Sequence, residues 1–215
     1  WTEFDPKWAA DRYRELLEIG INDYNIKPSM VFVEFLEGAK RMGQAAAIAI
    51  DADHPDATII PDVFHMHIGD SGFTGLRHLA GDFISIFQFN DAPANLPTDQ
   101  LKDEHRVYPG DGLLPLASTL RDLKHIGFNR CVSLELYNPT YWAQDHLSVA
   151  KTGLEKTLDV IRRFPAPVEE APADDAAEAE NEADTDADAP APDAGSTPGA
   201  AGVPEDEVPA AGASD

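Results

Sequence analysis

Four apolar runs of this sequence each carry, toward their carboxyl end, a polar residue of a type that can bind metals or move protons. These residues are Glu34, Asp62, Gln88 and Glu135. A carboxylate that is charged and unpaired inside an apolar run costs several kcal/mol. The four residues would compensate one another if they surrounded a single divalent cation. Three carboxylates and an amide oxygen are hard ligands, which suit Mn²⁺, Mg²⁺ or Co²⁺ better than a thiolate-type zinc site would.

The segments that must position these residues alternate between two periodicities. Near-continuous apolar runs predict strands at 30–36, 57–66, 83–89 and 130–136. Amphipathic patterns predict helices at 5–19, 39–52, 75–79, 116–126 and 146–164. This order predicts an α/β fold with a parallel sheet covered by helices. Chemistry in such folds gathers at the carboxyl ends of the strands, where the four polar residues fall.

Two α/β architectures fit this order of elements. One is a doubly wound open sheet, and the other is part of a (β/α)₈ TIM barrel. No glycine fingerprint follows the first expected strand, which argues against a dinucleotide-binding sheet. A complete barrel has eight strands and about 250 residues, whereas only four strands are expected here.

Other polar residues near the strand ends are candidates for binding a substrate. His65 and His67 have opposite parity in the second expected strand, so at most one points into the site, and we favour His65. Arg106 precedes a Pro-Gly-Asp-Gly turn at 109–112, just before an expected helix N-terminus. From there Arg106 could reach a substrate oxygen, or it could be a surface arginine beside a plain turn.

Each of the four candidate ligands also has an explanation without chemistry. Glu34 could pair with a flanking lysine such as Lys27, and Asp62 could cap a following turn. Gln88 could be a satisfied amide in the core, and Glu135 could face solvent after a short strand. The lone cysteine, Cys131, is expected to be a small buried residue deeper in its strand.

Charge divides the chain into two parts. All 16 Lys and Arg residues lie at or before Arg163, and the segment 166–215 contains 15 acidic residues and no basic one. We expect one globular domain over 1–165 and a disordered Ala/Pro/Asp/Glu-rich acidic tail over 166–215. The tail is either an interaction element or a solubilising extension. Nucleic-acid binding is not expected, because it needs clustered basic residues.

Composition also bears on location. No apolar run approaches the roughly 18–20 residues that cross a bilayer, and no signal peptide is visible. A single cysteine excludes a disulfide framework and suits a reducing compartment, so we expect a cytoplasmic protein without membrane contact. The sequence begins with Trp1 rather than Met, which suggests a processed or incomplete N-terminus.

Five short motifs together resemble the xylose-isomerase-like TIM barrel superfamily, which includes sugar phosphate isomerases and epimerases, inosose isomerases and 3-dehydroshikimate dehydratases. The motifs are Val-Glu-Phe at 33–35, Asp-Val-Phe-His at 62–65, Gln-Phe-Asn-Asp-Ala-Pro at 88–93, Arg-Val-Tyr-Pro-Gly-Asp-Gly at 106–112 and Ser-Leu-Glu-Leu-Tyr-Asn at 133–138. They run in the family's order and cover about residues 10–163. Each motif is weak alone, and the ordered set of five is a strong signal.

The resemblance implies roles for individual residues. Glu34, Asp62, Gln88 and Glu135 fall at the family's four metal-ligand positions, and the carboxylates at 34 and 135 also move the proton between adjacent carbons. The histidine at 65 and the arginine at 106 match substrate-binding positions. The implied activity is isomerisation or epimerisation of a small sugar or cyclitol through an enediolate intermediate. A divalent metal, for which Mn²⁺ is the first candidate, would stabilise this enediolate.

Two departures from the family keep more than one interpretation open. The third ligand position is most often histidine in the family, and glutamine occurs there in some members, including dehydratases of the 3-dehydroshikimate type. The four expected strands look like strands five to eight, so the first half of the barrel is absent. We favour a fragment over a half-barrel that pairs with another copy or subunit. A non-catalytic half-barrel subunit is a third hypothesis.

Overall fold

The computed structural model describes residues 4–163 of the chain, in which helices alternate with short strands. The helices are α1 (Pro6–Tyr24), α2 (Met42–Asp51), α3 (Val63–Ile68), α4 (Leu116–His125), α5 (Pro139–Trp142) and α6 (His146–Arg163). The strands are β1 (Met30–Val31), β2 (Ile59–Ile60), β3 (Ile86–Phe89) and β4 (Cys131–Leu134). Short 3-10 turns lie at Glu37–Ala39, Thr74–His78, Gly81–Phe83, Thr98–Gln100 and Asp103–His105.

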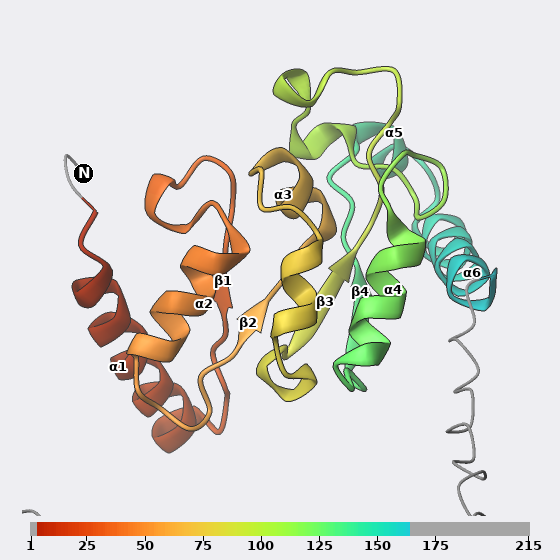
Figure 1. The fold of residues 1–215 in the computed structure, drawn as a ribbon. Coiled ribbons are helices and arrows are strands. Elements are labelled where there is room, and N and C mark those ends of the chain that lie inside the picture. The colour runs from red at the N-terminus through yellow and green to blue at the C-terminus, as the bar shows by residue number, and fades with distance from the viewer. Residues whose placement is uncertain (1–3, 164–215) are drawn as a thin grey trace, which may run out of the picture. The chain divides into compact units, whose positions relative to one another are not determined.

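The four strands lie side by side in chain order (Figure 1). β1 pairs with β2 and β3 pairs with β4, both in parallel. Two single parallel bridges, Ile59 to Ile84 and Asp62 to Gln88, join β2 to β3. The second of these bridges brings two of the predicted ligand positions next to each other on neighbouring strands. The predicted α/β class with parallel neighbours is therefore present in the described residues.

Helices and strands share one apolar core. The largest fully buried apolar side chains come from both kinds of element and include Leu17, Phe32, Ile59, Phe64, Phe87 and Phe89. Burial of a side chain of this size contributes about 1.5–3 kcal/mol relative to an exposed one. The core therefore holds the carboxyl ends of the strands in place, and the polar site is built on those ends.

The first helix extends beyond the expected 5–19. Asp5 caps it by accepting hydrogen bonds from the backbone N–H groups of Lys7 and Trp8. Gly20, which the sequence pattern places at the helix end, lies inside the helix, where the returning chain and Pro28 leave no room for a side chain. A Cβ at Gly20 would lie 2.7 Å from Cδ of Pro28. The helix ends at Asn25, which adopts the left-handed conformation instead.

Three of the expected strands end early in the structure, and the second shows why. The apolar run predicts a strand to residue 66, but α3 begins at Val63. The carboxylate of Asp62 accepts hydrogen bonds from the N–H groups of Phe64 and His65, at 2.7 and 3.2 Å, which starts a helix. His65 and His67 are therefore helical rather than extended, which corrects the strand-parity argument. Asp62 thus has the capping role that its sequence position allows.

Two features near β4 also differ from expectation. Cys131 is exposed rather than buried, because β4 is the last strand of the row in the described residues. The short helix α5 is absent from the expected elements; Asn138 caps it by accepting from the N–H of Thr140, and Pro139 occupies its first position. The dipeptide Asn138-Pro139 is the sequence signal that indicates this helix start.

The prediction of a disordered acidic tail at 166–215 concerns residues that lie outside the described range, and it stays a prediction. In residues 4–163, no helix combines the length and the hydropathy of a membrane-spanning segment.

Candidate active site

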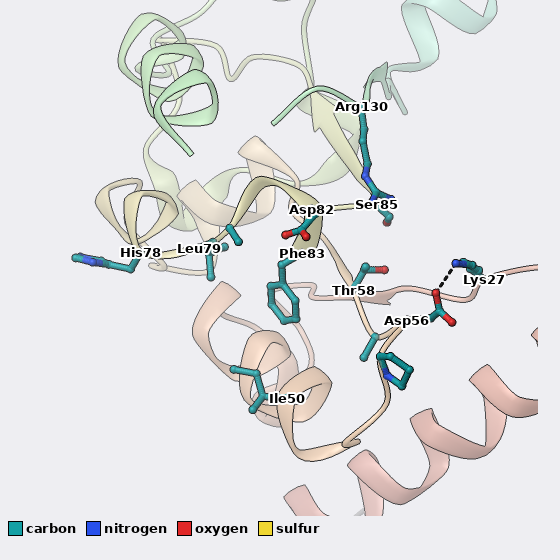
Figure 2. Close-up of a pocket in the computed structure, with 13 residues that line it drawn as sticks. Lys27, Ile50, Asp56, Thr58, His78, Leu79, Asp82, Phe83, Ser85 and Arg130 are labelled. Atoms are coloured by element: carbon teal, nitrogen blue, oxygen red, sulfur yellow. Dashed lines mark hydrogen bonds and ion pairs between the residues drawn. The ribbon is translucent and has the colours of Figure 1, made fainter. Parts of the chain in front are cut away.

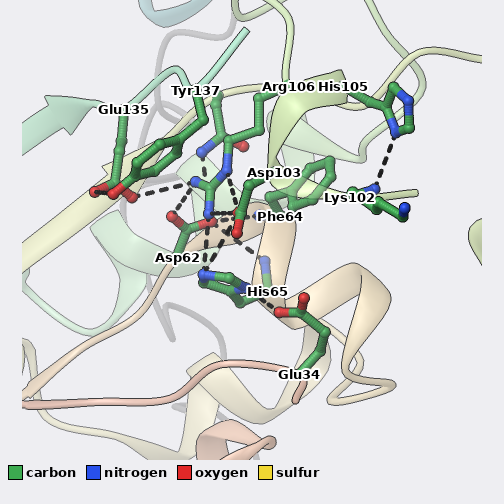
Figure 3. Close-up of polar contacts among 11 residues, drawn as sticks. Glu34, Asp62, Phe64, His65, Lys102, Asp103, His105, Arg106, Glu135 and Tyr137 are labelled. Atoms are coloured by element: carbon green, nitrogen blue, oxygen red, sulfur yellow. Dashed lines mark hydrogen bonds and ion pairs between the residues drawn. The ribbon is translucent and has the colours of Figure 1, made fainter.

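Four of the predicted site residues, Glu34, Asp62, His65 and Glu135, meet around a fifth, Arg106 (Figure 3). Glu34 follows β1, Asp62 follows β2, and Glu135 follows β4. His65 lies in the first turn of α3, directly after Asp62. Arg106 comes from the long connection between β3 and α4, and its guanidinium lies among the others. This convergence shows that the strand ends form one polar site.

Arg106 has no exposed surface and contacts carboxylates on two sides. Its Nη1 lies 2.5 Å from Asp62 Oδ2 and 3.2 Å from Glu135 Oε2. Its Nε and Nη2 both donate to Oδ1 of Asp103, at 2.9 and 2.6 Å. A buried guanidinium with this many charge-assisted hydrogen bonds keeps its place, whereas loss of one partner would leave an unpaired charge.

Two aromatic rings enclose the same guanidinium. Cζ of Arg106 lies 4.9 Å from the ring centroid of Phe64 and 5.4 Å from that of Tyr137. Burial alone would lower the pKa of Arg106, but the carboxylates of Asp62 and Asp103 outweigh it and raise the pKa above its ordinary value. The arginine is therefore a fixed positive charge in the centre of the site.

His65 connects Arg106 to Glu34. Its Nε2 lies 2.9 Å from Nη2 of Arg106, and a guanidinium can only donate, so Nε2 accepts. The ring proton is therefore on Nδ1, and His65 is neutral. Nδ1 lies 2.8 Å from Oε2 of Glu34, although the N–H and the oxygen are not aligned as a good hydrogen bond. Oε2 of Glu34 is thus a buried carboxylate oxygen with an imperfect partner.

The acidity of Glu135 is perturbed by its surroundings. Burial raises its pKa, and the adjacent carboxylate of Asp62 adds to this, while the charge of Arg106 acts in the opposite direction. Four carboxylates, those of Glu34, Asp62, Asp103 and Glu135, stand against the single charge of Arg106. The site therefore has an excess of negative charge, which favours a further cation.

Gln88 is the least engaged of the predicted ligands. Its backbone N–H donates to the carbonyl of Pro61 at 2.9 Å, next to Asp62. Its side chain is half-buried and makes no hydrogen bond to any of residues 4–163. An amide without a hydrogen-bond partner, next to Asp62, leaves its oxygen available to a cation or a substrate hydroxyl, and the explanation of Gln88 as a satisfied core amide does not apply.

The structure also decides between the alternative explanations for Glu34, Arg106 and His67. Glu34 faces His65, while Lys27 pairs with Asp56. Arg106 is fully buried, so it is not a surface arginine beside a plain turn. His67 lies outside the cluster, with its Nε2 3.3 Å from the hydroxyl of Thr98.

Two contributors to the site do not stand out in the sequence. Asp103 makes the doubled contact with Arg106, and Asn138 donates from Nδ2 to the carbonyl of Arg106 at 3.1 Å. Asp103 stands three residues before Arg106, the spacing of an ion pair on one helical turn, which is a weak signal. Nothing in the sequence indicates the contact between Asn138 and Arg106, because it joins residues on different elements.

The donor set fits a divalent ion chemically, although the side chains do not converge on one point. In residues 4–163 no three His, Cys, Asp or Glu side chains are close enough together to coordinate an ion. The reason is Arg106, because its Nη1 lies between the oxygens of Asp62 and Glu135 and acts as a stand-in cation. Occupation by a metal therefore requires the guanidinium to withdraw from these two carboxylates.

A hollow of about 390 Å³ adjoins the cluster. It is lined by Glu34, Lys102, Asp103, Glu104, Tyr137, Pro139 and Trp142. A volume of this order accommodates a small ligand. Its lining combines carboxylates, one lysine and two aromatic rings, which suits a small ligand with many hydroxyl groups.

A second hollow, of about 470 Å³, lies at the opposite ends of the strands (Figure 2). Lys27, Thr58, Ser85 and Arg130 each precede a strand and line it. None of the predicted site residues lies there. The candidate active site is thus confined to the carboxyl ends of the strands, as expected for this class of fold.

Comparisons with known proteins show which proteins this chain is similar to. A family model described as xylose isomerase-like TIM barrel matches residues 5–164. An inosose isomerase of Bacillus licheniformis is 31% identical over 142 residues, which are 66% of this chain and 51% of that protein. A 3-dehydroshikimate dehydratase of Pseudomonas putida is 33% identical over 109 residues, 50% of this chain and 17% of that protein.

Solved structures show the same likeness. The crystal structure of an IolI protein with a bound zinc atom has a TM-score of 0.68 and 28% sequence identity, and the match covers 76% of this chain and 60% of that one. This chain spans about half the length of the inosose isomerases that it matches. The resemblance inferred from the five motifs is confirmed: the chain belongs to the xylose isomerase-like TIM barrel family.

Proposed function

We propose that this chain carries the catalytic side chains of a divalent-metal-dependent isomerase or epimerase that acts on a small polyhydroxy carbonyl compound, such as a ketose or an inosose. The observation that supports this most is the convergence of three carboxylates and His65 on buried Arg106 at the strand ends. Similarity to inosose isomerases supports the same class. Because the chain covers about half of those proteins, the activity is that of the whole enzyme containing it.

Glu34, Asp62, Gln88 and Glu135 would hold the ion. Their oxygens suit Mn²⁺, our first choice, and Mg²⁺ or Co²⁺ as well. Zinc is a further candidate, since a related structure carries it. When bound, the ion supplies a Lewis acid that polarises the substrate carbonyl.

Glu34 and Glu135 would move the proton between adjacent carbons. They approach the cluster from the ends of the outer strands, β1 and β4, and lie on opposite sides of it in Figure 3. A base and an acid on opposite faces of a substrate carbon can remove a proton from one side and return it on the other. Burial and Asp62 raise the pKa of Glu135, which suits a group that takes up a proton as well as releasing one.

His65 and Arg106 would orient the substrate. Arg106 presents only donors and suits carbonyl, hydroxyl or carboxylate oxygens. His65, neutral with its proton on Nδ1, can donate to a substrate hydroxyl if Glu34 turns away. Both side chains are buried, so their freedom of movement is restricted before substrate arrives, which lowers the entropic cost of orienting the substrate.

Metal content tests the site directly. We would measure Mn, Co, Mg and Zn by elemental analysis in the purified chain, in Glu135→Gln and in Glu155→Gln. Glu155 is an exposed residue of α6, so its variant is a matched control for the lost charge. The proposal predicts about one ion per chain in the parent and the control, and loss in Glu135→Gln. Metal retained in Glu135→Gln, or absent from all three, contradicts it.

Gln88 favours a second candidate function, a dehydratase that uses the same site. Abstraction of a proton next to a carbonyl can be followed by loss of a β-hydroxide, which leaves a conjugated product. Similarity to 3-dehydroshikimate dehydratases supports this outcome. Ultraviolet absorbance with 3-dehydroshikimate and with inososes as substrates distinguishes the two functions. A new absorbance band identifies a dehydratase, and isomer interconversion without one identifies an isomerase.

We further propose that the described strands are strands five to eight of the barrel, and that strands one to four come from another segment or another copy. The substrate pocket would be completed by that half. A stable complex in which a partner supplies strands without any turnover would instead support a non-catalytic subunit.

We also propose a cytoplasmic location, in keeping with the single reduced cysteine.

A further inference from the structure

Asp91 is a buried carboxylate that the proposed reaction does not use. It is 1% exposed, and its two oxygens accept four backbone hydrogen bonds. Oδ1 accepts from the N–H groups of Ala92 and Leu114, both at 2.9 Å. Oδ2 accepts from those of Gly110 and Gly112, both at 3.0 Å. Backbone N–H groups arranged in this way form an anion-binding concavity, and here the anion is a side chain of the same chain.

Glycines in the turn make this wrapping feasible. A Cβ at Gly112 would lie 2.1 Å from the carbonyl oxygen of Ala92 and 2.4 Å from Oδ1 of Asp91. Gly110 has a φ of +87°, which side-chain-bearing residues rarely adopt. The Pro-Gly-Asp-Gly sequence at 109–112 therefore encloses the Asp91 carboxylate, and it does so only with glycine at both positions.

The backbone of Asp91 forms two hydrogen bonds with Val107, the residue next to Arg106. Its backbone N–H donates to the carbonyl of Val107 at 2.9 Å, and the N–H of Val107 donates back at 3.0 Å. The next residue toward the N-terminus is Arg106. Side chain and backbone of Asp91 together thus make six hydrogen bonds, and five of them hold the loop that begins at Arg106.

We propose that Asp91 is a positioning residue, which folds residues 106–114 around its carboxylate and thereby fixes the backbone from which the Arg106 side chain reaches the site. The inference rests on the proposed function, because that function gives Arg106 its role at the substrate. Asp91 itself contacts neither substrate nor metal in this scheme. Its effect passes through the backbone of the loop to one buried side chain.

The test compares Asp91→Asn with Asp111→Asn. Asp111 lies in the same turn but pairs at the surface with Lys156. Its variant therefore loses the same charge and leaves the enclosed carboxylate of Asp91 intact. The readout is the ¹⁵N NMR signal of the Arg106 Nε–H group, identified by its disappearance in Arg106→Lys. We expect the signal to shift or broaden in Asp91→Asn and to stay in place in Asp111→Asn. In the whole enzyme, KM should rise about tenfold or more in Asp91→Asn, with a smaller change in kcat.

Two further measurements keep the test decisive if Asp91→Asn does not fold. Gly112→Ala disturbs the same enclosure from the other side and should move the same signal. In the unmodified chain, the amides of Gly110, Gly112 and Leu114 should exchange hydrogen with the same opening free energy as Arg106 Nε–H. An unchanged Arg106 signal in the folded variants, or exchange independent of the three amides, overturns the inference. A moved signal with unchanged KM supports the positioning role and contradicts the substrate role of Arg106.

Discussion

Arg106 and a divalent metal compete for the same two carboxylates. The guanidinium neutralises Asp62 and Glu135, and it can do so because it is buried and held by Asp103 as well. A positive charge is therefore present at the centre of the site with or without an ion. This arrangement prevents the carboxylates from repelling one another, and it also weakens the site for metals.

Substitution of the arginine should therefore strengthen metal binding. We expect Arg106→Gln to bind Mn²⁺ about tenfold or more tightly than the parent, because close charges interact by several kcal/mol even at the effective dielectric constant of protein sites. Titration calorimetry measures the dissociation constant. Arg12→Gln is the control, since Arg12 pairs with Glu15 at the surface. Weaker binding in Arg106→Gln than in Arg12→Gln would show that the arginine supports the ion rather than competing with it.

His67 should add a pH dependence to stability that does not come from the site. Burial lowers its pKa below the ordinary value, against a raising effect of Asp91. The folded state therefore binds fewer protons than the unfolded state, and stability is lost as the pH falls through the ordinary histidine pKa toward the lowered one. The free energy of unfolding in urea, measured from about pH 7.5 to about pH 5, where histidines titrate, should depend less on pH in His67→Gln than in the parent. His78→Gln, which changes an exposed histidine, should match the parent.

At the scale of elements, the sequence predicted which segments are helices and strands better than where they end. The hydrophobic runs predicted all four strands, yet each strand is shorter than its run. Asp62 shows the physical reason, because a side chain that caps a helix ends the preceding strand. The same residue was predicted as a metal ligand from its position at a strand end. Cap and predicted ligand use the same location, and the sequence could not show that the second oxygen of Asp62 is paired with Arg106.

Tertiary contacts explain the rest of the differences. Gly20 has the sequence context of a helix end, but it lies inside α1, where the packing of Pro28 leaves no room for a side chain. The burial of Arg106 depends on Asp62, Asp103 and Glu135, which are brought to it by three different parts of the chain. Five motifs in family order predicted the set of site residues, but not the ion pairs that now link them.

Two helical glycines should respond in opposite ways to alanine. Gly20→Ala should destabilise the fold by about 1–3 kcal/mol, because the new Cβ would overlap Pro28 and the carbonyl of Ile26. Gly43→Ala in α2 should stabilise it by about 0.5–1 kcal/mol, since a Cβ there meets no atom within 4 Å and alanine favours helix. Chemical denaturation of both variants measures the difference. Equal effects would contradict the close approach of Pro28 to α1.

At the scale of the whole described domain, helix α6 presents exposed apolar side chains. Leu147, Leu154 and Ile161 recur every seven residues on α6 and are 81%, 60% and 37% exposed. They lie on the helix that packs beside β4. Leu154 also lines a hollow of about 440 Å³ with side chains of residues 132–136. A contiguous apolar surface next to an outer strand is a site of association.

A charge in this surface should reduce self-association. We expect Leu154→Glu to shift the chain toward monomer in sedimentation velocity, because a glutamate there opposes burial of the apolar hollow. Leu16→Glu is the control, since Leu16 of α1 is similarly exposed, at 55%, and lies away from that hollow. The prediction fails if both variants associate like the parent, or if the parent is already monomeric at high concentration.

The exposed thiol of Cys131 is a site for selective chemical labelling away from the candidate active site. It is the sole cysteine of the sequence, and it lies at the amino end of β4, whereas Glu135 and Tyr137 follow the carboxyl end of that strand. A maleimide dye, a spin label or a gold surface attached there would leave the mouth of the site facing solution. Immobilised chains would share one orientation, and a paramagnetic label would report the distance to a bound Mn²⁺ without mutation of any residue.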